Sequence, residues 1–509
     1  MSRWKNFLEC TELKNTKFEE LKAKAAEGFE RYGIYSGSLN QVGNALIMMV
    51  YDDTQKYLIM IGEDARLANL NGREEIIKGE KIKVCPITNE NCRVIRNIFI
   101  YTNPQAHKGK KITIGLGDRL GLASTGHIQT VKDLDVFPVL AQQSIRELNL
   151  TGRNYEDVLS SAAWAVFQEG YKKGYGADGD HLKTAEEVKM AVDVGMTMIT
   201  LDCSDHIDNS AAAGEVVELM EKYNRFSSEE RVKWEKRYAD KKFEIEGFEF
   251  FITSDELIRM ACVYGKAIQH TLDIYHNLIA KSGREIDFEM SIDETLTSTN
   301  PASHYFVSSE LINAGVDITS LAPRFCGEFQ KGIDYRGDLG QFIREFTVHV
   351  AIADYFGYKI SVHSGSDKFM VFPIVGEKTK GNYHLKTAGT NWLEALRVVA
   401  VKKPDLYRRM HAFALEHLHE ARKYYHISAK PENITALDRI KDSELAGLMD
   451  KEDSRQVMHI TYGLILLAKD KNGKSLFRDE LYEVLHKNEN EYTEALKKHI
   501  GKHLQSLGL

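Results

Sequence analysis

A short stretch of the chain concentrates side chains that can transfer protons or bind a metal ion. Residues 174–183 supply two carboxylates (Asp178 and Asp180), an imidazole (His181) and an amine (Lys183). Carboxylates and imidazoles serve as general acids, general bases and metal ligands. Solvated charges of an ordinary surface loop are the alternative interpretation of this one stretch.

The residues that follow indicate the start of a helix. Thr184 is a typical N-cap residue, and Glu187 stands three positions later, where a capping box requires a Glu or Gln. The reactive side chains are therefore predicted to lie between the end of a strand and the beginning of a helix.

The same order of strand, polar turn and helix recurs along much of the chain. Eight runs are predicted as strands: 112–118, 136–142, 174–181, 196–202, 286–294, 318–323, 359–363 and 383–387. Eight alternating units are what a (β/α)8 TIM barrel requires. An open, doubly wound sheet is the alternative, but no Gly-x-Gly-x-x-Gly sequence begins a helix here. An α/β barrel is therefore predicted over residues 106–390.

Three further regions accompany the predicted barrel. Residues 1–105 are predicted as an N-terminal α/β appendage, with a helix over 18–32 and strands over 45–51, 57–62 and 94–101. Residues 203–284 exceed what one crossover needs, so a helical insertion over the barrel mouth or side is expected. Residues 391–509 are predicted as a helical C-terminal region that packs against the barrel or forms an oligomer interface.

The composition favours a small molecule as the partner. The chain has 67 basic and 74 acidic residues and no basic run, which argues against a nucleic-acid surface. No signal sequence and no apolar run of roughly 18 residues is visible, so no membrane contact and a cytoplasmic location are expected. The six cysteines contain no Cys-x-x-Cys pair, which fits a reducing compartment. Assembly into a homo-oligomer is left open.

Polar residues at the strand ends form the candidate site, because the carboxyl ends of barrel strands meet at one catalytic face. These residues include Asp118, Arg119, Gln142, Gln143, Asp180, His181, Lys183, Asp202, Asp293, Glu294, Arg324, Glu328, His363, Ser364, Lys368 and Lys386. Histidines and carboxylates together suit a catalytic divalent metal. The alternatives are a solvent-facing imidazole for His181, a core histidine for His363, and surface carboxylates for Glu294 and Glu328.

The cations of this set indicate an anionic substrate. Arg324, together with lysines 183, 331 and 386, would suit a carboxylate or a phosphate. The Gly-Ser-Asp-Lys run at 365–368 could hold an anion through backbone N–H groups, but it lacks the P-loop pattern of nucleotide-binding proteins. An anionic sugar derivative is the expected ligand.

Three of these stretches resemble the class II, metal-dependent fructose or tagatose bisphosphate aldolases. They are Asp-Gly-Asp180-His181, Ile-Thr-Leu-Asp202-Cys-Ser and Val-His363-Ser-Gly-Ser. In that family the Asp of the Asp-His pair handles the substrate hydroxyl proton, the His binds zinc, and the last ligand heads a phosphate loop. This chain departs from the pattern by carrying Asp367-Lys368 in that loop and by lacking the middle His ligand. Both departures argue against a bisphosphate substrate.

The chain as a whole is similar to the tagaturonate/fructuronate epimerases of hexuronate catabolism. The phrases that carry this resemblance lie at 117–124, 176–183 and 361–369. It implies a metal-dependent isomerase that interconverts D-tagaturonate and D-fructuronate at C4. Retro-aldol cleavage and re-addition would reconcile this reaction with the aldolase-like motifs, because the hydrogen on C4 is not activated by the C2 ketone.

The resemblance also implies roles for the candidate residues. The metal ligands would be His181, Glu328 and His363, with Mn, Zn or Ni as the ion; Glu294 or Asp202 are the replacements for Glu328. Asp180 would remove the C4 hydroxyl proton, and Glu294 would exchange protons as its partner. The substrate would be held by Lys183, Arg324, Ser364, Lys368 and Lys386.

Two other functions compete with this interpretation. One is a true class II aldolase acting on a sugar acid or sugar phosphate, which would release a three-carbon product. The other is a non-catalytic sugar-acid-binding protein built on a barrel that has lost its activity.

Overall fold

The computed structural model describes residues 3–9, 16–27, 29–52 and 55–509. Eight parallel strands form a closed barrel, in the order β12-β13-β14-β15-β6-β7-β8-β9. Their bounds are β6 (Ile112–Leu116), β7 (Phe137–Ser144), β8 (Gly176–Leu182), β9 (Met198–Asp202), β12 (Asp287–Ile292), β13 (Ser320–Pro323), β14 (Lys359–Val362) and β15 (Tyr383–Thr387). The predicted (β/α)8 barrel and all eight of its strands are confirmed.

Helices follow the barrel strands, as the alternating pattern requires. They are α5 (Ser124–Val131), α6 (Ile145–Thr151), α7 (Tyr155–Glu169), α8 (Ala185–Val194), α12 (Pro301–Asn313), α13 (Leu339–Phe356) and α14 (Phe372–Thr379). The capping box predicted for α8 is present: the Thr184 side chain accepts from the backbone N–H of Glu187, whose carboxylate accepts from the backbone N–H of Thr184. Gly195 ends this helix with a left-handed φ of 109°, which an L side chain rarely adopts.

The interior of the barrel is unusually polar. In β12, Asp287, Glu289 and Ser291 alternate with Phe288, Met290 and Ile292, and all six side chains are buried. Because alternate residues of a strand face opposite sides, one set contacts the surrounding helices and the other faces the barrel axis. Charged groups on the axis need partners within the barrel.

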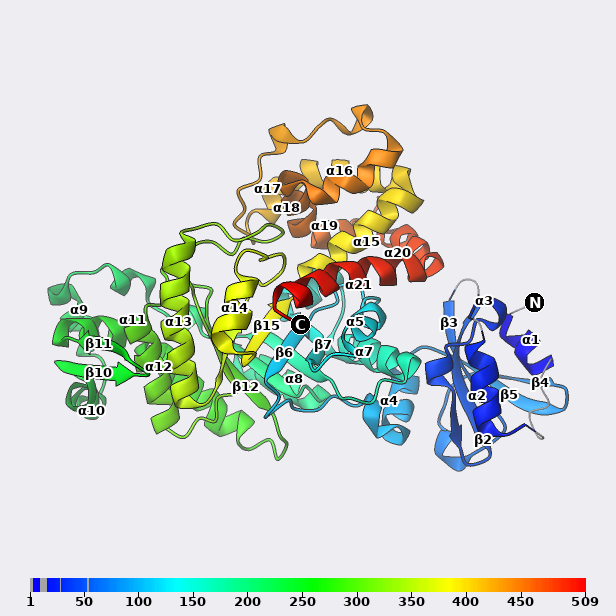
Figure 1. The fold of residues 1–509 in the computed structure, drawn as a ribbon, viewed down its shortest axis with the longest axis horizontal. Coiled ribbons are helices and arrows are strands. Elements are labelled where there is room, and N and C mark those ends of the chain that lie inside the picture. The colour runs from blue at the N-terminus through cyan, green and yellow to red at the C-terminus, as the bar shows by residue number, and fades with distance from the viewer. Residues whose placement is uncertain (1–2, 10–15, 28, 53–54) are drawn as a thin grey trace. The chain divides into compact units, whose positions relative to one another are not determined.

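The insertion after β9 contains a strand pair that the sequence did not lead us to expect. Its elements are α9 (Val216–Tyr223), α10 (Ser228–Tyr238), β10 (Lys241–Ile245), β11 (Phe248–Ile252) and α11 (Ser254–Ile274). The turn between the strands is Glu246-Gly247, with φ angles of 47° and 86°, as a tight hairpin turn needs. Phe248 and Phe250 pack against residues of α12 and α13, beside which the hairpin lies (Figure 1).

The N-terminal region forms an antiparallel sheet in the order β1-β2-β3-β5-β4. Its strands are β1 (Asn40–Val42), β2 (Ala45–Asp52), β3 (Gln55–Ile61), β4 (Arg73–Ile77) and β5 (Glu80–Pro86), with α1 (Arg3–Glu9), α2 (Phe18–Ala26) and α3 (Phe29–Tyr32) before them. The strands predicted over 45–51 and 57–62 are confirmed. The predicted helix over 18–32 is present as α2 and α3, with position 28 outside the described residues.

The strand predicted over 94–101 is wrong, because residues Asn89–Ile98 form helix α4. Thr88 caps this helix by accepting a hydrogen bond from the Asn91 backbone N–H. Cys92 and Ile95 then share one helical face and pack in the cluster that contains Trp164 of α7. Cys92 and Ile95 are three residues apart, which is a helical spacing, whereas the strand prediction depends on the number of apolar residues in 94–101.

The C-terminal region is helical, as predicted. It contains α15 (Gly389–Lys402), α16 (Pro404–Glu416), α17 (Leu418–Ala421), α18 (Glu452–Ile460), α19 (Tyr462–Leu467), α20 (Arg478–Lys487) and α21 (Glu489–Ser506). Trp392, Tyr407, Met458 and Tyr462 are fully buried in one cluster that these helices share (Figure 1).

The contacts of the chain divide it into two compact units. The first comprises Met1–Gln105, Leu116–Tyr175 and Ala388–Lys502, and the second comprises Ala106–Gly115, Gly176–Thr387 and His503–Leu509. All residues predicted to bind the metal, transfer protons or hold the substrate belong to the second unit, whereas the strand-end candidates Asp118, Arg119, Gln142 and Gln143 belong to the first.

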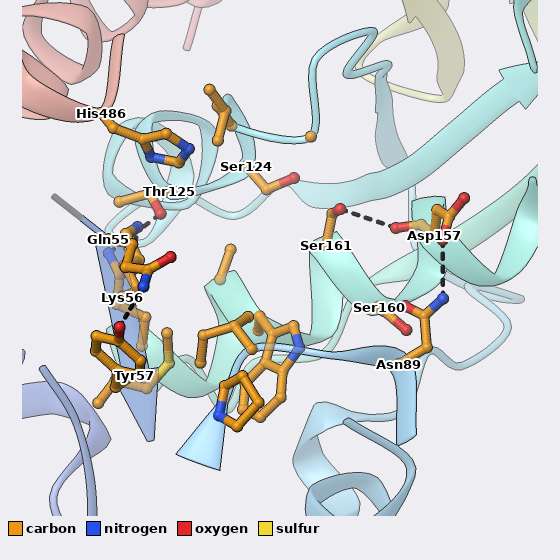
Figure 2. Close-up of a pocket in the computed structure, with 18 residues that line it drawn as sticks. Gln55, Lys56, Tyr57, Asn89, Ser124, Thr125, Asp157, Ser160, Ser161 and His486 are labelled. Carbon is orange, nitrogen blue, oxygen red and sulfur yellow. Dashed lines mark hydrogen bonds between the residues drawn. The ribbon is translucent and has the colours of Figure 1, made fainter. Parts of the chain in front are cut away.

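The first unit contains a cavity of about 370 Å³ (Figure 2). Its walls include Lys56 and Tyr57 of β3, Ser124 of α5 and Ser160 of α7. The Lys56 ammonium is already neutralised by Glu489, 2.6 Å away. None of the predicted site residues is among the described residues that line this cavity.

The described residues contain neither a disulfide nor a helix that could span a membrane. Cys85, Cys92, Cys203, Cys262 and Cys326 are buried free thiols, and Cys10 lies outside the described residues. Within the described ranges, no helix combines the length and apolar character needed to cross a bilayer.

The buried histidines predict that the protein loses stability in acid. Burial lowers the pKa of His411 to about 4 and that of His349 to about 4, below the ordinary value of 6.5. The stability gained from keeping each imidazole neutral is complete above pH 6.5 and is lost as the pH falls toward 4. We expect urea unfolding to show this decline, with a smaller slope in His411→Gln, by up to about 1.4 kcal/mol per pH unit. Equal slopes for both proteins would contradict the assignment.

Candidate active site

The carboxyl ends of β8, β9, β12, β13 and β14 bring most of the predicted residues to one face. Asp180 and His181 lie in β8, Asp202 ends β9, and His363 directly follows β14. Parallel pairing of β8 with β9, β9 with β12, β12 with β13 and β13 with β14 places these ends side by side.

An irregularity in β8 allows two consecutive side chains to meet. The register against β9 shifts between Gly179 and Leu182, and His181 has a left-handed φ of 50°. In a regular strand, neighbouring side chains point to opposite faces, whereas a bulge re-aims one of them. Asp180 Oδ1 and His181 Nε2 are 3.9 Å apart as a result. Such backbone strain is typical of functional sites.

His181 and His363 form the centre of a candidate metal site. Their ring centroids are 4.9 Å apart. With Asp293, they offer one ligand atom each, and these atoms lie within 4.8 Å of one another. Two imidazole nitrogens and a carboxylate oxygen are a donor set that suits Zn, Mn or Ni.

A second group of potential ligands shares His181. It contains Asp202, whose Oδ2 is 3.7 Å from His181 Nδ1, and the exposed carboxylate of Glu294. Asp202 and Glu294 are the residues that the sequence offered as replacements for Glu328. Glu294, predicted to exchange protons, therefore lies close to His181.

The structure does not bring Glu328 into either group among the described residues. Glu328 is exposed, its backbone pairs with that of Arg336, and its carboxylate accepts a hydrogen bond from Gln330. The geometry therefore favours Asp293 over Glu328 as the third ligand. Glu328 lies in the loop after β13, several residues beyond the strand end, and sequence position alone could not reveal the direction of its side chain.

Lys386 lies at the centre of a buried charge cluster. Its ammonium is 2.8 Å from Asp178 Oδ2, 2.8 Å from Asp180 Oδ1 and 3.0 Å from Glu289 Oε1. Three carboxylates thus surround one cation, which leaves this part of the barrel negative. A bound cation would offset that excess. Lys386 was predicted to hold substrate; these contacts favour a role in positioning Asp180, and a substrate contact stays a prediction.

The charges set the protonation of the carboxylates. Burial raises the pKa of Asp180, but Lys386 and His181 lower it further, to about 2. Burial raises the pKa of Asp178 to about 6, although Lys386 acts in the opposite direction. Asp180 is therefore ionised at neutral pH and able to accept a proton.

The surrounding carboxylates favour the protonated form of both histidines. Burial lowers the pKa of His181, but Asp180, Asp202 and the neighbouring acids raise it, to about 10. Burial likewise lowers the pKa of His363, and Asp293 raises it above its ordinary value. Protons on these imidazoles would thus offset the negative charge of the carboxylates, as a bound divalent cation would.

Two predicted substrate-binding cations lie at the rim. The half-exposed Lys183 donates to Asp205 and Ser204, at 2.7 and 3.0 Å. Arg324 directly follows β13 and is partly exposed. Its guanidinium forms no hydrogen bond or ion pair with any residue that the structure describes, so its donors are open to an anion.

The loop after His363 is fixed by hydrogen bonds from the buried Lys368 side chain. Lys368 is fully buried, and its ammonium donates to the backbone carbonyls of Gln330, Ile333 and Ser366, at 2.9, 2.6 and 2.8 Å. These bonds use its three N–H donors, so the geometry favours a structural role over the predicted substrate contact. Ser364, with φ of 50°, accepts a hydrogen bond from Lys331 at 2.8 Å and remains at the rim.

Sequence reasoning missed Glu289 and undervalued Asp293. Glu289 is fully buried in the middle of β12, and its Oε1 lies 2.7 Å from His363 Nε2. The available signal was the alternation of Asp287, Glu289 and Ser291 with apolar residues, which indicates a strand with one polar face inside a barrel.

Comparisons with known proteins agree on one family. A model of the tagaturonate epimerase family matches residues 35–507. A curated relative, the tagaturonate/fructuronate epimerase of Thermotoga maritima, is 39% identical over 477 residues, which cover 94% of this chain and 97% of the relative. The native structure of fructuronate-tagaturonate epimerase UxaE from Cohnella laeviribosi is 50% identical, with a TM-score of 0.91 and coverage of 96% of this chain and 99% of that chain. A structure of that protein with one glycerol gives a TM-score of 0.92 at 50% identity, covering 96% and 98%.

The raised pKa values of His181 and His363 predict that metal affinity rises with pH. An ion that binds His181 and His363 must displace their protons, so the dissociation constant should fall by up to about tenfold per pH unit for each proton released. Calorimetric titration with Mn²⁺ at pH 6, 7 and 8, in buffers of different ionisation enthalpy, measures both the affinity and the proton count. Binding that releases no proton would exclude the two imidazoles as ligands.

Proposed function

Because the chain belongs to the tagaturonate epimerase family and is therefore an epimerase, we propose that it interconverts D-tagaturonate and D-fructuronate by inverting C4. The observation that carries this proposal is the position of Asp180. This ionised carboxylate is held by Lys386 next to a group of two histidines and Asp293 on one face of the barrel. An oxygen base beside a cation site suits a substrate that must lose a hydroxyl proton.

Cleavage of the C3–C4 bond explains inversion at C4 better than deprotonation there. The C4 hydrogen is β to the C2 ketone, so its removal gives no conjugated carbanion. Removing the C4 hydroxyl proton instead lets the C3–C4 electrons move toward the ketone, leaving a three-carbon enediolate and a three-carbon aldehyde. The aldehyde rotates so that the opposite face of C4 meets the enediolate. The C3–C4 bond reforms on that face, and the proton returns to the C4 oxygen.

Asp180 accepts and returns that proton in this scheme. Its low pKa keeps it ionised at the start of the cycle, and the Lys386 hydrogen bond fixes one of its oxygens. Glu294, exposed and in one group with His181 and Asp202, is assigned as the partner acid or base that takes the proton from Asp180 and gives it back before the C3–C4 bond reforms. Both fragments must stay bound for the enzyme to be an epimerase rather than an aldolase.

The donor set of His181, Asp293 and His363 fits a divalent cation. The chemistry of two imidazoles and a carboxylate, and the excess of buried carboxylates around Lys386, both favour one. A divalent cation bound there supplies Lewis-acid stabilisation of negative charge on substrate oxygens. Mn, Zn and Ni are the candidates, and Asp202 with Glu294 is the alternative pair of carboxylates on His181.

The substrate carboxylate is assigned to Arg324 and Lys183. Arg324 presents an open two-pronged donor at the end of β13, and Lys183 adds a second positive charge beyond β8. Ser364 contributes a hydroxyl at the rim. We assign the reaction to hexuronate catabolism in the cytoplasm, and leave a homo-oligomer open.

A proton NMR time course tests the reaction. The protein is stripped of metal, resupplied with Mn, Zn or Ni, and mixed with D-tagaturonate; the spectra are taken with zinc, or after removal of the paramagnetic ions. We expect D-fructuronate to form only with an ion present and without three-carbon products. Release of a three-carbon aldehyde would favour the aldolase, and unchanged tagaturonate with every ion would overturn the proposal.

Asp180→Asn should nearly abolish turnover, because the amide keeps the shape of the side chain but cannot accept the proton. We expect kcat to fall by about 10²-fold or more, the usual contribution of a general base. Asp193→Asn is the matched control, since Asp193 is an exposed carboxylate at the far end of α8. Near-normal turnover of Asp180→Asn would transfer the role of base to another group.

A further inference from the structure

We propose that Glu289 is a positioning residue that sets the orientation of both His363 and Lys386. The inference rests on the proposed function, because it assigns His363 to the metal and Asp180 to proton transfer. Glu289 is in neither candidate ligand group among the described residues; it would act through His363 and Lys386, which it contacts.

Glu289 has the position that such a role requires. It lies in the middle of β12, three residues before the strand ends at Ile292, and its side chain is fully buried. Its carboxylate has four partners: His363 Nε2 at 2.7 Å, Lys386 Nζ at 3.0 Å, Thr200 Oγ1 at 3.2 Å, and the Ser320 hydroxyl. These partners come from β9, β13 and β15 and from the residue after β14, so Glu289 links four neighbouring parts of the barrel.

The contact with His363 determines which ring nitrogen faces the ion. An ionised carboxylate only accepts hydrogen bonds, so Nε2 of His363 must carry the proton that it donates to Glu289. Nδ1 lies 3.1 Å from Asp293 Oδ1, within the candidate ligand group, so it is the nitrogen whose proton an entering ion would displace and whose lone pair would then bind the metal. A carboxylate behind a metal-binding histidine fixes its tautomer and its ring orientation.

The contact with Lys386 extends the same control to the base. The Lys386 ammonium bridges Glu289 and Asp180, at 3.0 and 2.8 Å. Without the charge on Glu289, Lys386 would keep its ion pairs with Asp178 and Asp180 but lose the third one, so its ammonium would be held less firmly. Metal site and base are therefore aligned by one buried carboxylate.

The test compares two substitutions in the same strand. Glu289→Gln keeps the volume and removes the charge; Asp287→Asn is the matched control. Asp287 is also a buried carboxylate of β12, but it faces the opposite end of the barrel, where it accepts from the His107 backbone N–H at 2.6 Å. Calorimetry with Mn²⁺ should show affinity weakened by about 10- to 100-fold in Glu289→Gln and unchanged in Asp287→Asn. In Glu289→Gln, kcat should fall while KM changes little.

A spectroscopic measurement does not depend on the variant folding. In zinc-loaded wild-type protein labelled with ¹⁵N-histidine, the His363 signal, assigned by its loss in His363→Gln, should show a proton on Nε2 and zinc on Nδ1. Zinc on Nε2, or wild-type metal affinity in a folded Glu289→Gln protein, would overturn the proposal. The calorimetry and the NMR measurement do not use substrate. An absence of tagaturonate turnover would therefore refute the proposed function and leave this inference to be decided by those two measurements.

Discussion

The site depends on one buried ammonium group. Lys386 enters the barrel from β15 and holds Asp178, Asp180 and Glu289 within 3.0 Å. Burying a carboxylate without a partner is costly, and burying three of them near one another would drive protons onto them. The lysine keeps Asp180 ionised although the fold buries this carboxylate. Removing Lys386 would therefore change the chemistry of the base as well as its position.

The remaining excess of negative charge explains why histidines stand opposite the carboxylates. Asp180 and Asp202 approach His181, while Asp293 and Glu289 approach the two nitrogens of His363. With no ion, protons on the imidazoles compensate these acids; a divalent cation would take over that compensation and release the protons. The same electrostatic arrangement that would favour the proposed cation would thus make its binding sensitive to pH.

Part of the backbone strain in the described residues lies close to where these groups converge. Residues other than glycine with left-handed φ include His181 in β8, and Ser364 and Asp367 in the loop after β14. The surrounding structure compensates for this strain: α8 is fixed by a capping box directly after Lys183, and Lys368 ties its loop to three backbone carbonyls. Rigid strands and secured loops allow catalytic side chains to be held in conformations that a free chain would avoid.

The sequence by itself determined the barrel, its eight strands, and the placement of Asp180, His181 and His363 at strand ends, because hydrophobic periodicity, caps and strand-end chemistry are local signals. It also indicated the family through motifs in order. It did not determine α4 or the β10–β11 hairpin, where a helical cap and a two-residue turn outweighed the overall pattern. Only the tertiary structure decided that Glu328 is exposed and in neither group of potential ligands among the described residues, that Lys368 is internal, and that Asp293 and Glu289 contact His363. Those outcomes depend on where side chains from distant strands point once the barrel has closed, and spacing along the chain does not encode that direction.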